Sequence, residues 1–393
     1  MQLPDRPLRI TMLNKYYYPP HLGGVETHLR DISEGLVEHA HARVRAIVCN
    51  ESGERVEESI NGVDIIRLSR QFSLSSAPVA LSMPGAIRAE LRRLEPPDVM
   101  HFHFPYPWGE LSCLRANPDV ARIVTYHSDI VRQKRMLAAY RPFMERFLDS
   151  VDLIIASSPN MVEHSELLAP RAEKCRVVNF GLHVERIAGT TETLARAQAL
   201  QSRHPGRKIV LFVGRLIYYK GVDVLVRAMA DVDADLVIIG SGPLEGELRE
   251  IAMAHGVADR ITWLGPQRDE DLAAWYHAAD VFALPSVARS EAFGLVQIEA
   301  HAAGTPVVST NLTTGVPYAN LDGVTGLIVP VGDAPALGSA LNRLLRDDAL
   351  RERLGQQAKA RALVEFTIPQ MVAGHLSAYA EAMERHAHKR GRA

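Results

Sequence analysis

The sequence predicts an α/β protein built from two Rossmann-like domains, each a doubly wound, mainly parallel sheet. Two observations indicate this class. Short apolar runs alternate with stretches of helical spacing in the first half of the 393 residues, and the same alternation starts again in the second half. Buried parallel strands joined by helical crossovers produce such runs, because helices cover both faces of the sheet. The length is sufficient for two large domains.

The apolar runs place the strands in two sets. The first set is expected at 8–13, 43–48, 99–102, 123–126 and 153–156, with helical spacing between strands at 27–36 and 85–94. The second set is expected at 208–213, 235–239, 261–264, 281–284 and 306–309. Two helices are expected near the end, at 350–364 and 369–385, separated by a break that contains Pro369.

The change from one strand set to the other defines the domains. Asn179-Phe180-Gly181-Leu182 follows a strand-like run and precedes a polar stretch, so it is the expected boundary. We therefore expect an N-terminal domain over 1–180 and a C-terminal domain over 181–365. The last helix, within 366–393, is expected to cross back to the N-terminal domain.

Composition and charge exclude several classes of protein. Hydrophobic residues make up 47% and charged residues 23%, values typical of soluble globular proteins, so collagen-like, coiled-coil and disordered chains are excluded. The net charge is 44 − 46 = −2, which divides near residue 180 into 22 − 22 = 0 and 22 − 24 = −2. Neither half has the basic surface of a general nucleic-acid binder, so no nucleic-acid partner is expected.

Cysteine content and hydropathy indicate where the protein works. The 3 cysteines are widely spaced, which favours neither a metal cluster nor a disulfide framework and fits a reducing compartment. No uncharged apolar stretch approaches the roughly 18 to 20 residues that span a bilayer. We expect a cytoplasmic protein that acts at most at the inner face of the cell membrane.

The most specific motif is Ser290-Glu291-Ala292-Phe293-Gly294-Leu295 through Glu299, which follows the strand expected at 281–284. A strand that leads into a helix start lies at the carboxyl edge of the sheet, where ligands bind. Amides near Gly294 and Leu295 suit a diphosphate. Glu291 and Glu299 can accept hydrogen bonds from sugar or ribose hydroxyls. Two glutamates alone could also be ordinary helix and surface charges, but the apolar neighbours of Glu299 favour the functional interpretation.

A second motif places two cations between a strand and a helix. Arg215 follows the strand expected at 208–213, and Lys220-Gly221 precedes a helix expected over 222–230. Both cations could converge on phosphates and neutralise a leaving diphosphate. A basic surface loop is the alternative interpretation.

A third motif, Gly23-Gly24, follows the first strand and permits close backbone approach to a ligand. The fingerprint GxGxxG is missing, so NAD binding is not expected. His127 lies at the end of the strand expected at 123–126, where a structural histidine is the alternative to a functional one. His101 and His103 are expected to point to opposite faces of their strand, and for that reason no metal site is predicted.

Segment 132–151 combines an apolar stripe at helical spacing with five basic residues. The stripe is most simply a face that packs into the core. The basic residues also permit contact with an anionic membrane surface or with a pyrophosphate-linked lipid.

Taken in order, these motifs resemble the retaining glycosyltransferases of family 4, over nearly the full length of the chain. The resemblance rests on Gly23-Gly24-Val25-Glu26, Thr125-Tyr126-His127, Gly214-Arg215 with Lys220-Gly221, Gly240-Ser241-Gly242-Pro243, and the pair Glu291 and Glu299. It implies the GT-B fold, with two Rossmann-like domains facing a central cleft. The N-terminal domain would serve the acceptor side, and the C-terminal domain would bind a nucleotide sugar.

The resemblance also implies a role for each motif. The diphosphate would be bound by Arg215 and Lys220, and the ribose by Glu299. Glu291 would bind hydroxyls of the donor sugar. Gly242 and the backbone of Phe293, Gly294 and Leu295 would complete the donor site from the C-terminal domain. Gly23, Gly24 and His127 would approach the donor from the N-terminal domain, with His127 near the sugar 6-hydroxyl. Glu291 and His127 are the two residues expected to act at the reacting sugar.

Longer strings such as 213–223 and 285–291 are similar to bacterial enzymes that add mannose or related sugars to O-antigen or exopolysaccharide. The expected reaction is retaining transfer of a hexosyl group, from GDP-mannose, to a glycan or lipid-pyrophosphate-linked acceptor, with no cofactor and no metal. Three alternatives stay open: a UDP-sugar-dependent transferase of the same fold, a nucleotide-sugar epimerase, and a binding protein without catalysis. Donor incubated without acceptor separates the epimerase, and turnover separates the binding protein.

Overall fold

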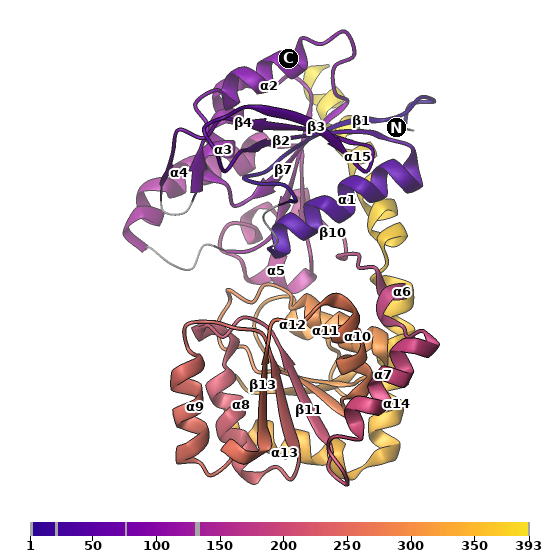
Figure 1. The fold of residues 1–393 in the computed structure, drawn as a ribbon. Helices are drawn as coiled ribbons and strands as arrows, with labels where there is room; N and C mark the ends of the chain where they lie inside the picture. The colour runs from indigo at the N-terminus through magenta and orange to yellow at the C-terminus, as the bar shows by residue number, and fades with distance from the viewer. Residues whose placement is uncertain (1–2, 20–22, 75–76, 130–133, 392–393) are drawn as a thin grey trace. The chain divides into compact units, whose positions relative to one another are not determined.

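The computed structural model describes residues 3–19, 23–74, 77–129 and 134–391, apart from the side chains at positions 74 and 134–139. The chain forms two compact units. Unit 1 contains Met1–Gly181 together with Ile368–Ala393, and unit 2 contains Leu182–Thr367. Each unit is an α/β body with its own sheet (Figure 1).

Among the described residues, unit 1 has an eight-stranded sheet in the order β10-β9-β8-β7-β1-β2-β4-β3. Neighbouring strands are parallel except for the antiparallel pair β3 and β4. A separate two-stranded ribbon pairs β5 with β6. The strands are β1 (Arg9–Leu13), β2 (Arg43–Cys49), β3 (Val56–Ile60), β4 (Val63–Leu68), β5 (Phe72–Leu74), β6 (Ala77–Val79), β7 (Val99–Phe104), β8 (Ala121–Tyr126), β9 (Leu153–Ala156) and β10 (Cys175–Val177).

Helices connect these strands and cover the sheet of unit 1. They are α1 (Gly24–Ala40), α2 (Met83–Leu91), α3 (Pro107–Ala116), α4 (Lys134–Ser150), α5 (Pro159–His164) and α15 (Ile368–Arg390), with a 3-10 turn at Ala169–Lys174. Although α15 ends the chain, its residues Met371, Val372 and Tyr379 belong to the same apolar core as β1 and α1. In Figure 1 the yellow end of the chain accordingly lies with the indigo beginning.

Unit 2, as far as the structure describes it, has a six-stranded sheet in the order β13-β12-β11-β14-β15-β16, and every neighbouring pair is parallel. The strands are β11 (Ile209–Val213), β12 (Asp235–Ile239), β13 (Ile261–Gly265), β14 (Val281–Leu284), β15 (Val307–Thr310) and β16 (Gly326–Val329). The helices are α6 (Val184–Ile187), α7 (Thr191–Gln201), α8 (Val222–Ala228), α9 (Glu245–Ala254), α10 (Asp269–Ala278), α11 (Leu295–Ala303), α12 (Val316–Ala319), α13 (Ala334–Arg346) and α14 (Asp348–Glu365). Short 3-10 turns occupy Tyr218–Lys220, Met229–Asp231 and Ala258–Arg260.

The structure confirms the two predicted sets of parallel strands and adds strands that the apolar runs did not identify. The hairpin of β3 and β4 turns at Asn61 and Gly62, whose φ angles are 50° and 80°. Asn-Gly is the favoured pair for such a turn, because both positions need positive φ. The solvent-facing pattern of β3 hid this strand, whereas the Asn-Gly pair could have revealed it.

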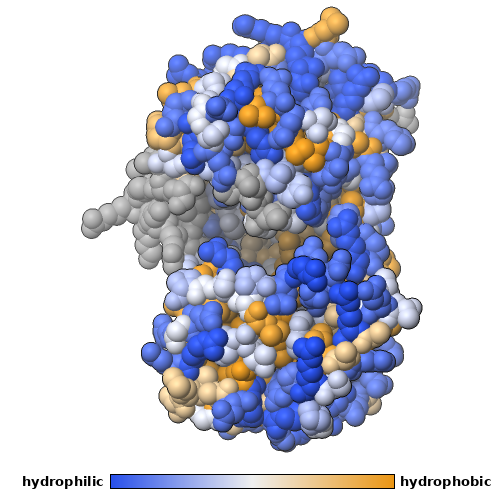
Figure 2. Space-filling view, viewed as in Figure 1, coloured by the Kyte–Doolittle hydropathy of each residue, from blue (hydrophilic) through white to orange (hydrophobic). Residues whose placement is uncertain are grey.

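The surface of both units is mixed in character. Figure 2 shows hydrophilic residues over most of the described surface in view, with hydrophobic residues scattered in small groups. Among the helices of the described residues, none combines the length and the apolar character that crossing a membrane requires.

Candidate functional site

Unit 2 has a topological switch point at the carboxyl ends of β11 and β14. The chain passes from β11 to β12 on one side, and β14 later pairs with the other side of β11. In open α/β sheets the connections diverge at such a point and leave a crevice in which ligands bind. Lys220 lies in the loop after β11, and Glu291 lies in the loop after β14. Sequence motifs about 70 residues apart therefore meet at the position where this fold binds ligands.

The centre of this position is a buried ion pair. Lys220 Nζ lies 2.6 Å from Glu291 Oε2, and both side chains are about nine-tenths buried. Ser286 Oγ donates a second hydrogen bond to the same carboxylate oxygen at 2.8 Å. A buried pair adds little net stability, because desolvation opposes the attraction between the charges. Its presence at the ligand-binding edge therefore favours a functional explanation.

Hydrogen bonds between loops hold the pair in place. The amide of Val287 donates to the carbonyl of Tyr219 at 2.8 Å, which joins the loop after β14 to the loop after β11. Thr310, at the end of β15, donates from Oγ1 to the carbonyl of Ser286 at 2.6 Å. Loops after three neighbouring strands thus form one connected edge. Ser286 was not predicted from the sequence, because a single serine after a strand has no distinctive pattern.

The helix α11 begins at this edge. Gly294 is its N-cap residue with φ of 74°, a conformation that glycine adopts at no cost. The amide of Gln297 donates to the carbonyl of Gly294 at 3.0 Å, whereas the amides before it have no helical carbonyl one turn earlier. Phe293 is buried beside this start, and Leu295 is partly buried. The predicted anion-binding helix start is therefore a helix start in the structure.

Glu299 lies within α11 and is oriented by a buried tyrosine. Tyr276 of α10, which is fully buried, donates its hydroxyl hydrogen bond to Glu299 Oε2. Burial raises the pKa of Glu299, while this hydrogen bond and the charge of Lys220 act to lower it. Tyr276 was missed from the sequence because it lies in an ordinary apolar stretch. It fixes the carboxylate in one orientation.

The two predicted phosphate-binding cations have different environments. Lys220 is buried and paired, whereas Arg215 is exposed and its side chain has no hydrogen bond or ion pair to any described residue. Burial raises the pKa of Tyr219, and the charges of Lys220 and Arg215 both act to lower it. Lys220 Nζ lies 5.6 Å from the centre of the Tyr219 ring. The side chain of Arg215 can therefore bind an anion directly, whereas Lys220 already forms an ion pair with Glu291.

Gly242 has a structural reason to be glycine. A Cβ atom at this position would lie 2.3 Å from the carbonyl oxygen of Leu216 and 2.7 Å from its amide nitrogen. These backbone atoms belong to the loop after β11, so Gly242 lets the loop after β12 pack directly against it. This close approach explains the glycine whether or not Gly242 also contacts a ligand.

Gly242→Ala is expected to lower the free energy of unfolding of unit 2 by about 1–3 kcal/mol, because backbone atoms have to shift. Thermal or denaturant unfolding measures the change. Gly246→Ala is the matched control: it lies in α9, where an added Cβ would have no described atom within 4 Å. Alanine there is expected to raise stability by up to about 1 kcal/mol. Equal stabilities of the two variants would contradict this packing argument.

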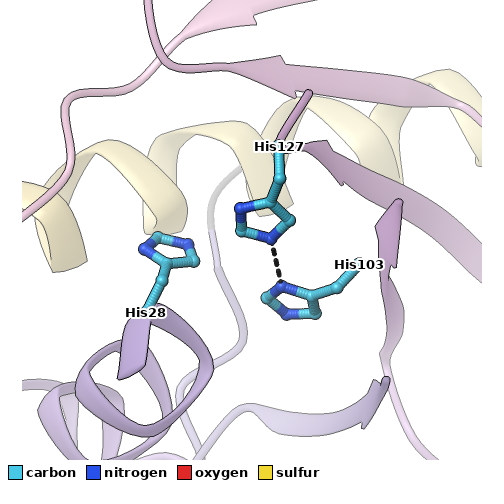
Figure 3. Close-up of side chains that lie close together, drawn as sticks. All are labelled: His28, His103 and His127. Carbon is cyan, nitrogen blue, oxygen red and sulfur yellow. Dashed lines mark hydrogen bonds between the residues drawn. The ribbon is translucent and has the colours of Figure 1, made fainter. Parts of the chain in front are cut away.

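Unit 1 has a corresponding switch point at β1 and β7, and a group of histidines lies there. β1 pairs with β2 on one side and with β7 on the other. His28 is on α1, which follows β1, while His103 is on β7 and His127 follows β8. His103 Nδ1 and His127 Nε2 share a hydrogen bond of 2.9 Å. Figure 3 shows the three rings turned toward one another.

The expectation that His101 and His103 point to opposite faces is wrong. Their rings stack with centroids 4.8 Å apart. Side chains alternate between faces at successive positions, so residues two apart share a face. His101 Nδ1 is hydrogen-bonded to the Tyr379 hydroxyl at 2.8 Å, and His101 Nε2 to Thr125 Oγ1 at 2.7 Å. His103, stacked on His101, is in turn hydrogen-bonded to His127. The geometric objection to a metal site at these histidines is therefore removed.

These histidines, together with His375 of α15, form a buried cluster of neutral rings. Burial lowers the pKa of every member, to about 3 for His127 and about 4 for His375, and well below the usual value for the others. The pKa of His127 is lowered further by the charge of Lys15, which lies 3.8 Å from Glu26. His28, which no sequence motif singled out, is the member carried by α1.

The predicted glycine pair, Gly23 and Gly24, lies at the start of α1. Gly23 is the N-cap of α1, where a Cβ would lie 2.6 Å from Glu26 Oε2, and Gly24 begins the helix with no described atom within 4 Å of such a Cβ. The preceding residues 20–22 of this motif lie outside the described residues. Among the described residues, nothing at Gly24 obstructs the close approach of a ligand.

The amphipathic stretch 132–151 contains the whole of α4. Positions 132 and 133 and the side chains up to 139 lie outside the described residues. Met144, Phe147 and Leu148 are buried, so this part of the stripe packs into the core. Phe143, by contrast, is 48% exposed, and with Arg146 it lines a groove beside Trp108 of α3.

Comparisons with known proteins agree with this architecture. Residues 22–186 match the family model described as Glycosyltransferase Family 4, and residues 197–361 match the model described as Glycosyl transferases group 1. The structure is similar to sucrose-phosphate synthase from Thermosynechococcus elongatus, with a TM-score of 0.78, 25% identity, and coverage of 95% of this chain and 98% of that chain. The chain therefore belongs to the family 4 glycosyltransferases and has the GT-B fold.

Two curated relatives narrow the comparison. The O-antigen chain mannosyltransferase C of Escherichia coli is 32% identical over 379 residues, which cover 96% of this chain and 99% of the relative. The D-rhamnosyltransferase WbpZ of Pseudomonas aeruginosa is 38% identical over 270 residues, which cover 69% of this chain and 70% of the relative. The chain is thus a glycosyltransferase with full-length similarity to an O-antigen enzyme.

Proposed function

We propose that the protein is a retaining mannosyltransferase that uses GDP-mannose to extend a glycan or a lipid-pyrophosphate-linked glycan in cell-surface polysaccharide synthesis. The observation that carries the proposal is the buried Lys220–Glu291 pair at the switch point of unit 2. It supplies a cation for a diphosphate beside a carboxylate for sugar hydroxyls. Full-length similarity to a mannosyltransferase of O-antigen chains supports the choice of sugar and pathway.

In the proposed donor complex, Arg215 and Lys220 neutralise the diphosphate, which also lies at the amides of Phe293, Gly294 and Leu295 at the start of α11. Glu299, oriented by Tyr276, accepts hydrogen bonds from the ribose. Glu291 accepts hydrogen bonds from hydroxyls of the sugar, so the donor replaces part of its contact with Lys220. We propose that Gly242 also belongs to this donor site, at the place where the loop after β12 packs against the loop after β11.

We also propose for residues of unit 1 the roles that the family resemblance implies. His127 contacts the donor sugar near its 6-hydroxyl, and Gly23 and Gly24 allow the backbone to approach the diphosphate. The bond between the anomeric carbon and the diphosphate breaks while an acceptor oxygen bonds to the same face of that carbon. The acceptor's proton passes to the leaving phosphate oxygen. This front-face route needs no protein nucleophile, whereas a double displacement would require a carboxylate nucleophile. No cofactor is assigned.

We propose that the protein acts in the cytoplasm, at the inner face of the membrane where a lipid-linked acceptor is presented. The three cysteines are free and buried, in keeping with a reducing compartment. The groove beside Phe143 offers an aromatic side chain next to Arg146, a combination that suits anionic lipid surfaces.

Transfer of labelled mannose from GDP-mannose to lipid-linked acceptors in anionic vesicles tests the function. We expect label in the vesicle lipid fraction and retention of the α configuration in the product. UDP-glucose as donor tests the UDP-sugar alternative. GDP-mannose without acceptor tests the epimerase, which would change the donor sugar by itself. Donor binding without any transfer to an acceptor panel would favour a binding protein and contradict the proposal.

A further inference from the structure

We propose that His28, His103 and His127 form a binding site for one divalent transition-metal cation of the Zn²⁺ class. The three residues come from three elements of unit 1, namely α1, β7 and the turn after β8 (Figure 3). Each can offer one ring nitrogen such that the three atoms all lie within 4.8 Å of one another.

The spacing of the rings fits a tetrahedral ion with three imidazole ligands. A Zn–N bond of about 2.0–2.1 Å puts ring centroids about 3.2 Å from the ion and therefore about 5 Å from each other. The observed centroid distances are 5.2 Å between His28 and His127, 5.2 Å between His103 and His127, and 5.8 Å between His28 and His103. The three centroid separations are therefore close to the value that one shared ion requires.

Unsatisfied nitrogens supply the second observation. Both ring nitrogens of His28 and the Nε2 of His103 are buried without a hydrogen-bond partner among the described residues. The exposed fractions of His28, His103 and His127 are only 4%, 2% and 6%. Buried polar atoms normally have partners, because an unpaired one loses the hydrogen bonds that it makes to water in the unfolded chain. A cation bound by His28 would satisfy one of these atoms.

The protonation states of the rings also suit a metal. Buried imidazoles are neutral here, and the neutral ring is the form that binds metals. On binding, the hydrogen bond between His103 Nδ1 and His127 Nε2 is replaced by two bonds to the ion. The shared proton moves to a ring nitrogen that faces away from the ion, so no net proton has to leave.

The donor set determines the class of cation. Imidazole nitrogens favour Zn²⁺, Cu²⁺, Ni²⁺ and Co²⁺, whereas Mg²⁺ and Ca²⁺ favour oxygen ligands. With only three protein ligands, the fourth position of a tetrahedral ion stays open for water. The charge of Lys15, which acts on His127, is balanced by Glu26 at 3.8 Å.

Binding would inhibit transfer, because the ion would occupy the His127 nitrogen and the space beside it. This consequence rests on the proposed function, whereas metal binding itself does not. Submicromolar or micromolar Zn²⁺ would then reduce transfer, and a chelator would restore it. Failure of transfer in all conditions would count against the proposed function only, since binding is measured on the protein without donor.

Titration of the full chain with Co²⁺, followed by its visible absorption and by calorimetry, is the direct test. We expect one tetrahedral Co²⁺ per chain, displaced by Zn²⁺ and unaffected by Mg²⁺. His28→Phe, which removes one ligand, is expected to weaken binding by at least about 100-fold. His375→Gln is the matched control. This histidine is buried in the same cluster, with its ring centroid 5.9 Å from that of His28, but it is not one of the three proposed ligands. Its Co²⁺ affinity should stay close to that of the wild type.

X-ray absorption of the wild-type protein with one equivalent of Zn²⁺ keeps the test valid if a variant does not fold. Three imidazole ligands at about 2.0 Å are expected. A shell of oxygen atoms only, binding weaker than millimolar, or equal binding by folded His28→Phe would overturn the proposal.

Discussion

Glu291→Ala is expected to lower the free energy of unfolding of unit 2 by about 3–5 kcal/mol and to abolish transfer. The ammonium of Lys220 would stay buried without the carboxylate that lies 2.6 Å from it. An unpaired buried charge is costly, because the protein interior does not replace the water that solvated it. Lys220→Ala should cost a similar amount, since it leaves the Glu291 carboxylate unpaired.

A double variant separates stability from function at this site. Lys220→Met with Glu291→Leu removes both charges and keeps most of the side-chain volume. Apolar replacement of a complete buried pair is often neutral or stabilising, so we expect the double variant to regain most of the stability lost by either single variant. Donor binding and transfer should stay lost. Denaturant unfolding and the transfer assay, run on the same preparations, check both expectations.

Glu245→Ala provides the comparison with an exposed pair. Glu245 lies 2.8 Å from Arg249 on α9, where both side chains are more than a third exposed. Loss of such a pair is expected to cost less than about 1 kcal/mol.

If the double variant of Lys220 and Glu291 were as unstable as the two single variants, the result would contradict the stability argument for the buried pair. A double variant that still transfers sugar would contradict the function of the pair in donor binding.

The second large effect is a loss of stability of unit 1 in mild acid. His28, His101, His103, His127 and His375 are neutral when folded, with the pKa of His127 lowered to about 3 and that of His375 to about 4. The unfolded chain binds protons at these residues near pH 6.5. Between that pH and the folded pKa values the unfolded state binds more protons, so stability falls as pH falls.

The magnitude follows from the number of rings. Each histidine lowers the free energy of unfolding by a little more than about 1 kcal/mol for every pH unit below 6.5, until its folded pKa is reached. Because five rings act in the same direction, a steep loss of the stability of unit 1 is expected below pH 6.5. Thermal unfolding measured from pH 8 to pH 5, with a chelator present, should show constant stability above pH 7 and a steep fall below pH 6.5.

His28→Phe is expected to make that fall less steep. Its ring nitrogens have no partner among the described residues, so an apolar ring of similar size should cost little at pH 8 and stabilise at pH 5. His255→Gln, at an exposed position in unit 2, should leave the slope unchanged. A flat profile in the wild type, or the same slope in His28→Phe, would contradict the cluster of neutral rings.

The parallel strands could be predicted because burial on both faces leaves a plain apolar run, as in β11 and β14. The hairpin of β3 and β4 could not be identified in this way, since β3 is mostly solvent-exposed. Its Asn61-Gly62 turn was the signal that could have found it. An apolar run shows that a strand is buried, but it does not show which strand lies beside it.

The sequence motifs identified individual residues of the candidate site but not the contacts between them. Lys220 and Glu291 were both predicted, yet their pairing depends on β11 and β14 being neighbours in the sheet, which no local pattern specifies. The hydrogen bond from Tyr276 to Glu299 likewise depends on the packing of α10 beside α11, which no local pattern specifies. His28 was missed because one histidine on a helix has no meaning until the fold places it beside His103 and His127.

The measurement that tests the central proposal most directly is calorimetric titration of GDP, UDP, ADP and their mannose and glucose derivatives into the wild type and Arg215→Ala. Arg215 is exposed and without a described partner, so its loss should leave the fold intact. We expect GDP-mannose to bind the wild type most tightly and Arg215→Ala about 10-fold to 100-fold more weakly, since one charge-assisted contact is lost. Arg227→Ala, an exposed arginine on α8, should bind like the wild type. Binding of no nucleotide, or equal binding by Arg215→Ala, would contradict a diphosphate site at the switch point of unit 2.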